Sequence, residues 1–327
     1  MIHALIAAVL ASTLSSWPVF GHDPARSGVD VGDRTLAPAN VGLLRARWQI
    51  SLGTVADSAP ILLDRVVVAG VAREMLFQTA KNGVTYGIDA ATGRILWRFS
   101  TRGPNITTAT PAADPSGKAI YVPGVDGFVR KLDAATGREL RAPGFPARVT
   151  LMTQTEKDAS GLNVANGYLY ATTSGYDGDA PPYDGHVVSV RLSDGSTHVF
   201  NSLCSRDRSL PTPTSCNQSD SGIWSRAGAV VDPDPSMQGR VYAATGNGDF
   251  NANTGGHNYG DSVVSLTADA GRLLGNYTPS NFDQLEANDT DLGSTGPAML
   301  PRQNGSSTPL LLVQGGKDSI FRLVNRA

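Results

Sequence analysis

The chain has 327 residues, a formal net charge of −2, 17% charged residues, 36 glycines and 20 prolines. The near-zero charge excludes the strongly basic surface of a nucleic-acid-binding protein, and the 40% hydrophobic content excludes a disordered chain. Abundant glycine and proline with few charges are typical of turn-rich β structure, and single all-β domains reach this length. We therefore expect one all-β domain.

A leader and an entry segment come first. Residues 2–14 form a short apolar run followed by Ser15 and Ser16, the pattern of a signal-peptide core before a cleavage site. The run is too short to span a bilayer, and we expect no transmembrane segment in the mature chain. We assign 1–16 to a signal peptide and 17–45 to a lead-in segment, and expect an exported protein, periplasmic or extracellular.

A repeated unit then defines a domain at 46–327. Residues 82–99 combine an alternating strand, an Asp-Ala-Ala-Thr-Gly turn at 89–93 and a second strand that contains a tryptophan. The same turn returns at 133–137, 44 residues later, which is about the length of one propeller blade. Because one such antiparallel unit cannot bury both of its faces, we expect the units to stack around an axis as a β-propeller of four-stranded antiparallel blades.

Five blades can be followed in chain order. They cover approximately residues 58–99, 109–140, 161–195, 222–266 and 292–324. Residues before the first blade, with Trp48, resemble the last strand of a further blade, and the fifth blade stops before its final turn. Either this N-terminal strand closes a five-bladed ring, or the chain is the front part of a larger propeller.

Two cysteines, Cys204 and Cys216, bracket a polar loop between the third and fourth predicted blades. In an exported protein, a disulfide between them is the simplest interpretation. Closing a loop of this size would stabilise the fold by roughly 3 kcal/mol in the chain-entropy description.

The repeats resemble those of pyrroloquinoline quinone (PQQ) propellers, the quinoprotein alcohol dehydrogenase-like superfamily. The stretches 222–263, 288–294 and 315–318 are closely similar to a secreted subgroup, and the resemblance covers nearly the whole mature chain. That family usually has eight blades. The resemblance therefore implies about five blades of an eight-bladed fold, with the chain incomplete at its C-terminus, rather than a closed five-bladed ring.

The resemblance also implies a cofactor site. In catalytic members, a Thr-Gly-Asn-Gly-x-Pro-Trp-Asn segment supplies an asparagine to a calcium ion beside the quinone, and a downstream aspartate is the base. Residues 245–248 match the opening of that segment, which makes Asn247 a candidate cofactor contact and Asn251 a candidate cofactor contact and calcium ligand. Asp289 and Asp291 are the candidate bases.

Four further residues are candidates for the site. Trp224 faces either the central channel and a quinone or a neighbouring blade, and Arg226 either meets an anionic ligand or forms a buried ion pair. Asp177 and Asp179 lie in an insertion at 176–184 and offer hard oxygen ligands for calcium. The alternative for these aspartates is ordinary turn chemistry.

Departures from the catalytic pattern weigh against activity. The Pro-Trp pair, the adjacent cysteine pair of the family and a haem-attachment sequence are missing, and Glu156 is the only suggestion for the family's glutamate ligand. We therefore expect a non-catalytic scaffold that presents its loops and channel to a protein or glycan. The alternative is a PQQ- and calcium-dependent dehydrogenase that oxidises an alcohol or sugar.

Overall fold

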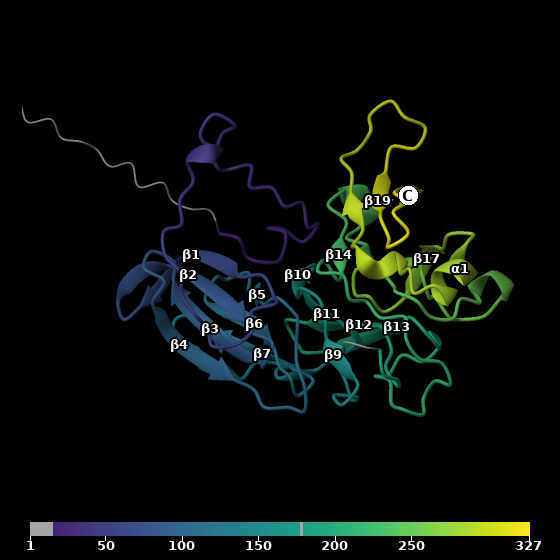
Figure 1. Cartoon of the computed structure of the whole chain (residues 1–327), viewed down its shortest axis with the longest axis horizontal. Helices are drawn as coiled ribbons and strands as arrows, with labels where there is room; N and C mark the ends of the chain where they lie inside the picture. Colours follow the sequence, from purple (N-terminus) through teal and green to yellow (C-terminus); the bar gives the residue numbers. More distant parts are fainter. Residues whose placement is uncertain (1–15, 177–178) are drawn as a thin grey trace, which may run out of the picture.

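The computed structural model describes residues 16–176 and 179–327, so the predicted signal peptide, apart from its last residue, and Asp177 lie outside the described residues. Five antiparallel β-sheets follow one another along the chain, and we name them blade 1 to blade 5 (Figure 1). The predicted all-β fold built from four-stranded antiparallel blades is confirmed.

The strands of the blades have the following bounds. Blade 1 comprises β1 (Ile61–Val68), β2 (Val71–Thr79), β3 (Val84–Asp89) and β4 (Ile95–Ser100). Blade 2 comprises β5 (Ala112–Ala113), β6 (Ala119–Pro123), β7 (Phe128–Asp133) and β8 (Ala147–Arg148). Blade 3 comprises β10 (Asn163–Ala165), β11 (Tyr168–Gly175), β12 (His186–Arg191) and β13 (Thr197–Asn201), and β9 (Glu156–Asp158) pairs with the end of β11. Blade 4 comprises β14 (Val230–Val231), β15 (Val241–Ala244), β16 (Val263–Leu266) and β17 (Leu273–Tyr277).

Blade 5 has three strands, β18 (Ala298–Met299), β19 (Leu311–Gln314) and β20 (Arg322–Asn325). Within the described part of the chain, β20 pairs only with β19, so the N-terminal segment does not close a five-bladed ring. Short helices lie in the connections. They are η1 (Val41–Leu43), η2 (Pro235–Met237), η3 (Ala252–Thr254), α1 (Phe282–Ala287) and η4 (Leu292–Ser294). Among the described residues, no helix has the length and apolar character needed to cross a membrane.

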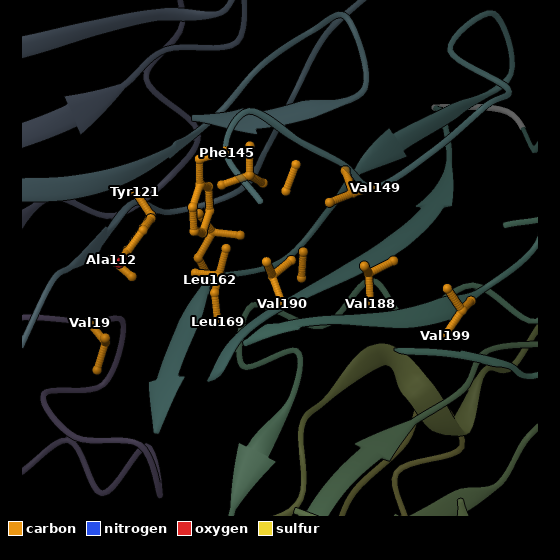
Figure 2. Close-up of a cluster of buried hydrophobic side chains, with 13 residues drawn as sticks. Val19, Ala112, Tyr121, Phe145, Val149, Leu162, Leu169, Val188, Val190 and Val199 are labelled. Atoms are coloured by element: carbon orange, nitrogen blue, oxygen red, sulfur yellow. The ribbon is translucent and has the colours of Figure 1, made fainter. Parts of the chain in front are cut away.

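The hydrophobic core lies between the blades. Figure 2 shows the layer between blades 2 and 3, where Tyr121 of β6 and Phe145, in the loop before β8, belong to one cluster with Leu169 and Val188 of blade 3. Similar clusters join blades 1 and 2, blades 3 and 4, and blades 4 and 5. Each sheet therefore buries its apolar face against its neighbour, which is why a single blade could not fold alone.

Tryptophans connect one blade to the turn of the next. The indole N–H of Trp97, in β4, donates to the carbonyl of Ala134 at 3.0 Å. Trp48 repeats this contact on blade 1, where its indole N–H donates to the carbonyl of Ala90 at 2.8 Å. The residues around Trp48 form no strand, because no described strand lies beside them to pair with. Each tryptophan thus packs against the turn of the blade that follows it in the chain.

The lead-in segment crosses the inner edges of four blades. Trp17 bridges to Leu62 of blade 1, and Pro18 accepts a hydrogen bond from the backbone of blade 2. The carbonyl of Pro24 then accepts hydrogen bonds from the side-chain amide of Asn163 in blade 3 and from the backbone N–H of Val231 in blade 4. This segment thus links the first four blades to one another along their inner edges.

Candidate functional site

A polar cleft opens at one end of blades 3, 4 and 5. Most of its lining residues precede the innermost strand of a blade or follow the second strand, so loops distant in sequence meet there. The residues that matter for its chemistry are Tyr176, Asp179, Trp224, Asn247, Asp291 and Lys317. This brings together Trp224, Asn247, Asp179 and Asp291, which the sequence nominated from three separate stretches.

Asp291 is held rigidly at the cleft wall. Its side chain is 4% exposed; Oδ1 accepts the backbone N–H of Asn247 at 2.7 Å, and Oδ2 lies 2.6 Å from the ammonium of Lys317. A Cβ added at Gly246 would lie 3.0 Å from Asp291 Oδ1, so glycine permits this close approach. The Asp291 carboxylate is therefore held by the Asn247 amide and the Lys317 ammonium, and it packs closely against the backbone of Gly246.

Lys317 joins three other elements of the site. Its ammonium also lies 3.1 Å from Asp289 Oδ1 and 5.5 Å from the centre of the Trp224 ring. Burial alone would lower the pKa of Lys317, but the bonds to Asp291 and Asp289 prevail and raise it. The cleft therefore holds a positive charge beside an aromatic face.

Trp224 and Asn247 are the cleft residues with spare binding capacity. Trp224 is 37% exposed although tryptophan favours burial. The side-chain amide of half-buried Asn247 makes no hydrogen bond to the described residues, while its backbone is used on both sides. A flat aromatic face and a free amide oxygen can receive a planar ring and a cation.

The backbone around this cleft is strained at several positions. Several non-glycine residues near it adopt positive φ angles, a conformation that costs free energy and clusters at functional sites. They are Asp179 (46°), Asp220 (89°), Ser221 (54°), Asp261 (45°) and Asp289 (50°). Ser221 donates its N–H to the carbonyl of Asn247 at 2.6 Å, so the strained backbone directly supports a cleft residue.

Carboxyl groups make the surroundings of the cleft acidic. Burial raises the pKa of Asp220 and of Glu286, with further increases from neighbouring carboxylates that include Asp291. Burial also raises the pKa of Asp261 to about 7. Such a concentration of negative charge favours a cation in the cleft.

The remaining candidates lie elsewhere. Arg226 does not line the cleft; it pairs with Asp57 at 2.5 Å and donates to the carbonyl of Thr108. The sequence offered an ion pair as the alternative, but it expected a buried one, whereas the Arg226 side chain is 44% exposed. The Asn251 side chain donates to Asp249 and accepts the Asn258 N–H, which ties it to its own loop.

Asp289 is 65% exposed and reaches the site only through Lys317. Glu156 is buried in blade 3, where Oε2 accepts the Asp184 N–H at 3.0 Å, and it does not line the cleft. Both positions weaken the case for a direct contact with a bound cofactor.

The sequence did not single out Lys317 or Tyr176. A signal for Lys317 was present, since it is the only cation between Arg302 and Arg322. No described group of three or more His, Cys, Asp or Glu side chains could hold a metal ion. Asp179 and Asn247 can therefore supply only part of the ligand set of a cation in the cleft, and the cofactor would have to supply further ligands.

Residues 17–327 match the PQQ family of glucose, ethanol and alcohol dehydrogenase β-propeller domains. The chain belongs to this family. The resemblance of the repeats to PQQ propellers is thereby confirmed. The predicted disulfide is also present, with Cys204 and Cys216 bonded to each other.

Several known quinoproteins are similar to this PQQ-family chain. The dehydrogenase subunit of a quinone alcohol dehydrogenase from Komagataeibacter europaeus is 25% identical, and the match covers 76% of this chain and 36% of that protein. A polyvinylalcohol dehydrogenase from a Pseudomonas species is 24% identical over 73% of this chain and 36% of that protein. The chain thus spans well under half the length of these curated relatives.

Solved structures share the fold of this PQQ-family chain. A quinohaemoprotein alcohol dehydrogenase from Pseudomonas putida gives a TM-score of 0.68 at 18% identity, covering 95% of this chain and 46% of that one. A europium-containing methanol dehydrogenase gives a TM-score of 0.69 at 16% identity, and the match covers 95% of this chain and 56% of that one. Both likenesses establish the propeller architecture.

Proposed function

We propose that the cleft binds PQQ with a divalent cation and that the chain carries out the oxidation of an alcohol or sugar. The observation that carries this proposal is the set of contacts around Asp291, whose carboxylate is fixed by Asn247 and Lys317 beside the exposed face of Trp224. Family membership and this cleft favour the dehydrogenase alternative over the non-catalytic scaffold expected from the missing family residues.

The residues present fit the cofactor. Trp224 offers a face on which a planar tricyclic ring can stack, and Lys317 offers a charge for its carboxylate groups. The free amide of Asn247 and the carboxylate of Asp179 offer oxygen ligands for calcium or a similar hard cation. We therefore propose Asn247 as the asparagine ligand of the cation, in place of Asn251, which the sequence suggested.

In this proposal the chemistry that bound PQQ supplies is acceptance of a hydride at its quinone. Asp291 takes the hydroxyl proton of the substrate, because its buried carboxylate faces the cleft and cannot swing away from its two partners. Lys317 stabilises the negative charge that develops near it. Asp289 holds Lys317 in place from the solvent side.

The test is a titration of the purified chain with PQQ and calcium, followed by quinone absorbance and by dye-linked oxidation of alcohols and sugars, with short polyvinyl alcohol included. We expect stoichiometric binding, and at least ~100-fold slower turnover in Asp291→Asn with binding retained. The control Asp289→Asn should lose less than tenfold. No binding of PQQ by the folded chain would refute the enzyme and leave a scaffold with a protein or glycan partner.

We also propose that the protein is exported to the periplasm or beyond. The disulfide supports this, because such bonds persist in oxidising compartments. Mass spectrometry of the secreted or periplasmic protein should find a mature N-terminus close to Trp17. An intact Met1 on cytoplasmic protein would contradict export.

A further inference from the structure

Asp261 lies behind the cleft and touches both loops that carry its key residues. Its own N–H donates to the carbonyl of Gly246 at 2.8 Å, directly before Asn247. Its Oδ1 accepts the N–H of Leu292 at 2.9 Å, directly after Asp291. Since the Asn247 N–H in turn donates to Asp291 Oδ1, these three bonds close a ring.

The contact between these two loops is tight. A Cβ added at Gly293 would lie 2.5 Å from the backbone carbon of Thr245, so the backbones pack without any side chain between them. Neither loop belongs to a strand at this point, and they come from blades 4 and 5. Asp261 is the residue whose backbone bonds one loop and whose side chain bonds the other.

An aspartate at position 261 costs folding free energy, and the local structure alone gives no reason for it. It is 1% exposed, its φ angle of 45° would suit glycine or asparagine better, and its Oδ2 has no partner among the described residues. A buried unpaired carboxylate oxygen and a strained backbone both cost free energy. Such costs are typical of a residue whose position serves the site.

We infer that Asp261 is a positioning residue that sets the geometry of Asp291 against Asn247 across the boundary between blades 4 and 5. Without its carboxylate, the Leu292 N–H loses its acceptor and the turn at Asp291 is released from the Asn247 loop. The catalytic consequence of this inference rests on the proposed function, but the clamp itself does not.

Two substitutions at the position separate its roles. Asp261→Gly accommodates the positive φ and keeps the backbone bond to Gly246, but it removes the bond to Leu292. Asp261→Asn keeps an oxygen at Oδ1 and should restore the clamp. The matched control is Asp269→Ala, since Asp269 Oδ1 accepts the Gly271 N–H at 3.0 Å in a turn of the same blade away from the cleft.

Hydrogen exchange of the Asn247 and Leu292 amides tests the clamp without any cofactor. We expect at least tenfold faster exchange of both amides in Asp261→Gly, and wild-type rates in Asp261→Asn and in the control. Unchanged protection of the Asn247 amide in a folded Asp261→Gly protein would overturn the inference. This readout holds whether or not the wild-type chain binds PQQ.

Steady-state kinetics tests the catalytic consequence if the wild-type chain turns over alcohol. Asp261→Gly should then lower kcat at least tenfold with KM within threefold, and Asp261→Asn should restore kcat to within threefold of wild type. An equal loss of kcat in the Asp269→Ala control would overturn the positioning role, because it would indicate a general effect on stability.

Discussion

At the scale of single residues, burial decides what the acidic side chains can do. Glu156 is buried, and its Oε1 has no hydrogen-bond partner among the described residues. Burial raises the pKa of Glu156 to about 8, although its hydrogen bonds work in the opposite direction. The neighbouring His186 has a pKa lowered by burial, so it does not supply a compensating charge at neutral pH.

This burial predicts a pH dependence of stability. The folded protein keeps the Glu156 proton up to about pH 8, whereas the unfolded chain releases it near the ordinary pKa of 4.5, so stability falls as pH rises between these values. Glu156→Gln should remove this pH-dependent loss of stability. From pH 5 to pH 8, its free energy of unfolding should therefore rise by at least ~1 kcal/mol relative to that of wild type. Urea unfolding at both pH values measures it. Glu139→Gln is the half-exposed control, and parallel curves for Glu156→Gln and wild type would contradict the prediction.

Among the structural elements, the repeated turn of blade 2 packs directly against Trp97 of blade 1, and we call this contact the joint between the two blades. In the turn of blade 2, the Gly137 N–H donates to the backbone carbonyl of Asp133, and the glycine adopts a φ of 71°. A Cβ there would lie 2.4 Å from the Trp97 ring. Glycine in this turn therefore serves both the turn and the packing of the preceding blade.

This joint predicts a graded loss of stability. Trp97→Ala should lower the free energy of unfolding by about 3–5 kcal/mol, since it opens a cavity between blades 1 and 2. Trp97→Phe should cost less, because it mainly leaves the Ala134 carbonyl without its donor. Trp48→Ala is the comparison, and it should cost less than Trp97→Ala because Trp48 is only partly buried. Equal losses at the two tryptophans, measured by guanidinium unfolding, would refute this account.

At the scale of the whole molecule, the lead-in segment ties blades together that no strand connects. Arg26 donates to the carbonyls of Gly161 and Leu162 in the approach to blade 3 and to Ala227 in the approach to blade 4. One planar guanidinium thus joins two blades near the axis, which an ammonium could not reproduce.

Removing that guanidinium should weaken the assembly of blades. Arg26→Ala and Arg26→Lys should each lower stability by about 2–3 kcal/mol, because buried carbonyls lose charged donors. Arg34→Ala, in the exposed part of the same segment, should change little. Thermal unfolding followed by circular dichroism measures the difference. A midpoint for Arg26→Lys equal to that of wild type would show that the fork geometry is not needed.

The blades could be predicted from the sequence, because alternation, the Asp-Ala-Ala-Thr-Gly turns and the tryptophans are local patterns that repeat. It also predicted the disulfide, since two cysteines in one polar loop leave one pairing. It nominated Asn247 and Asp291 from a resemblance, and Trp224 as a residue that faces either the channel or a neighbouring blade, without showing that the three meet.

Which of the candidates share the cleft depends on how the blades and their loops pack. Asn247 and Asn251 are equal as sequence letters, but the packing of one loop turns the first toward Asp291 and ties the second to Asp249. Lys317 and Asp261 act through contacts between blades 4 and 5, which no local pattern encodes. Strand patterns depend on neighbours in sequence, whereas this site is made by loops that meet only when the blades stack.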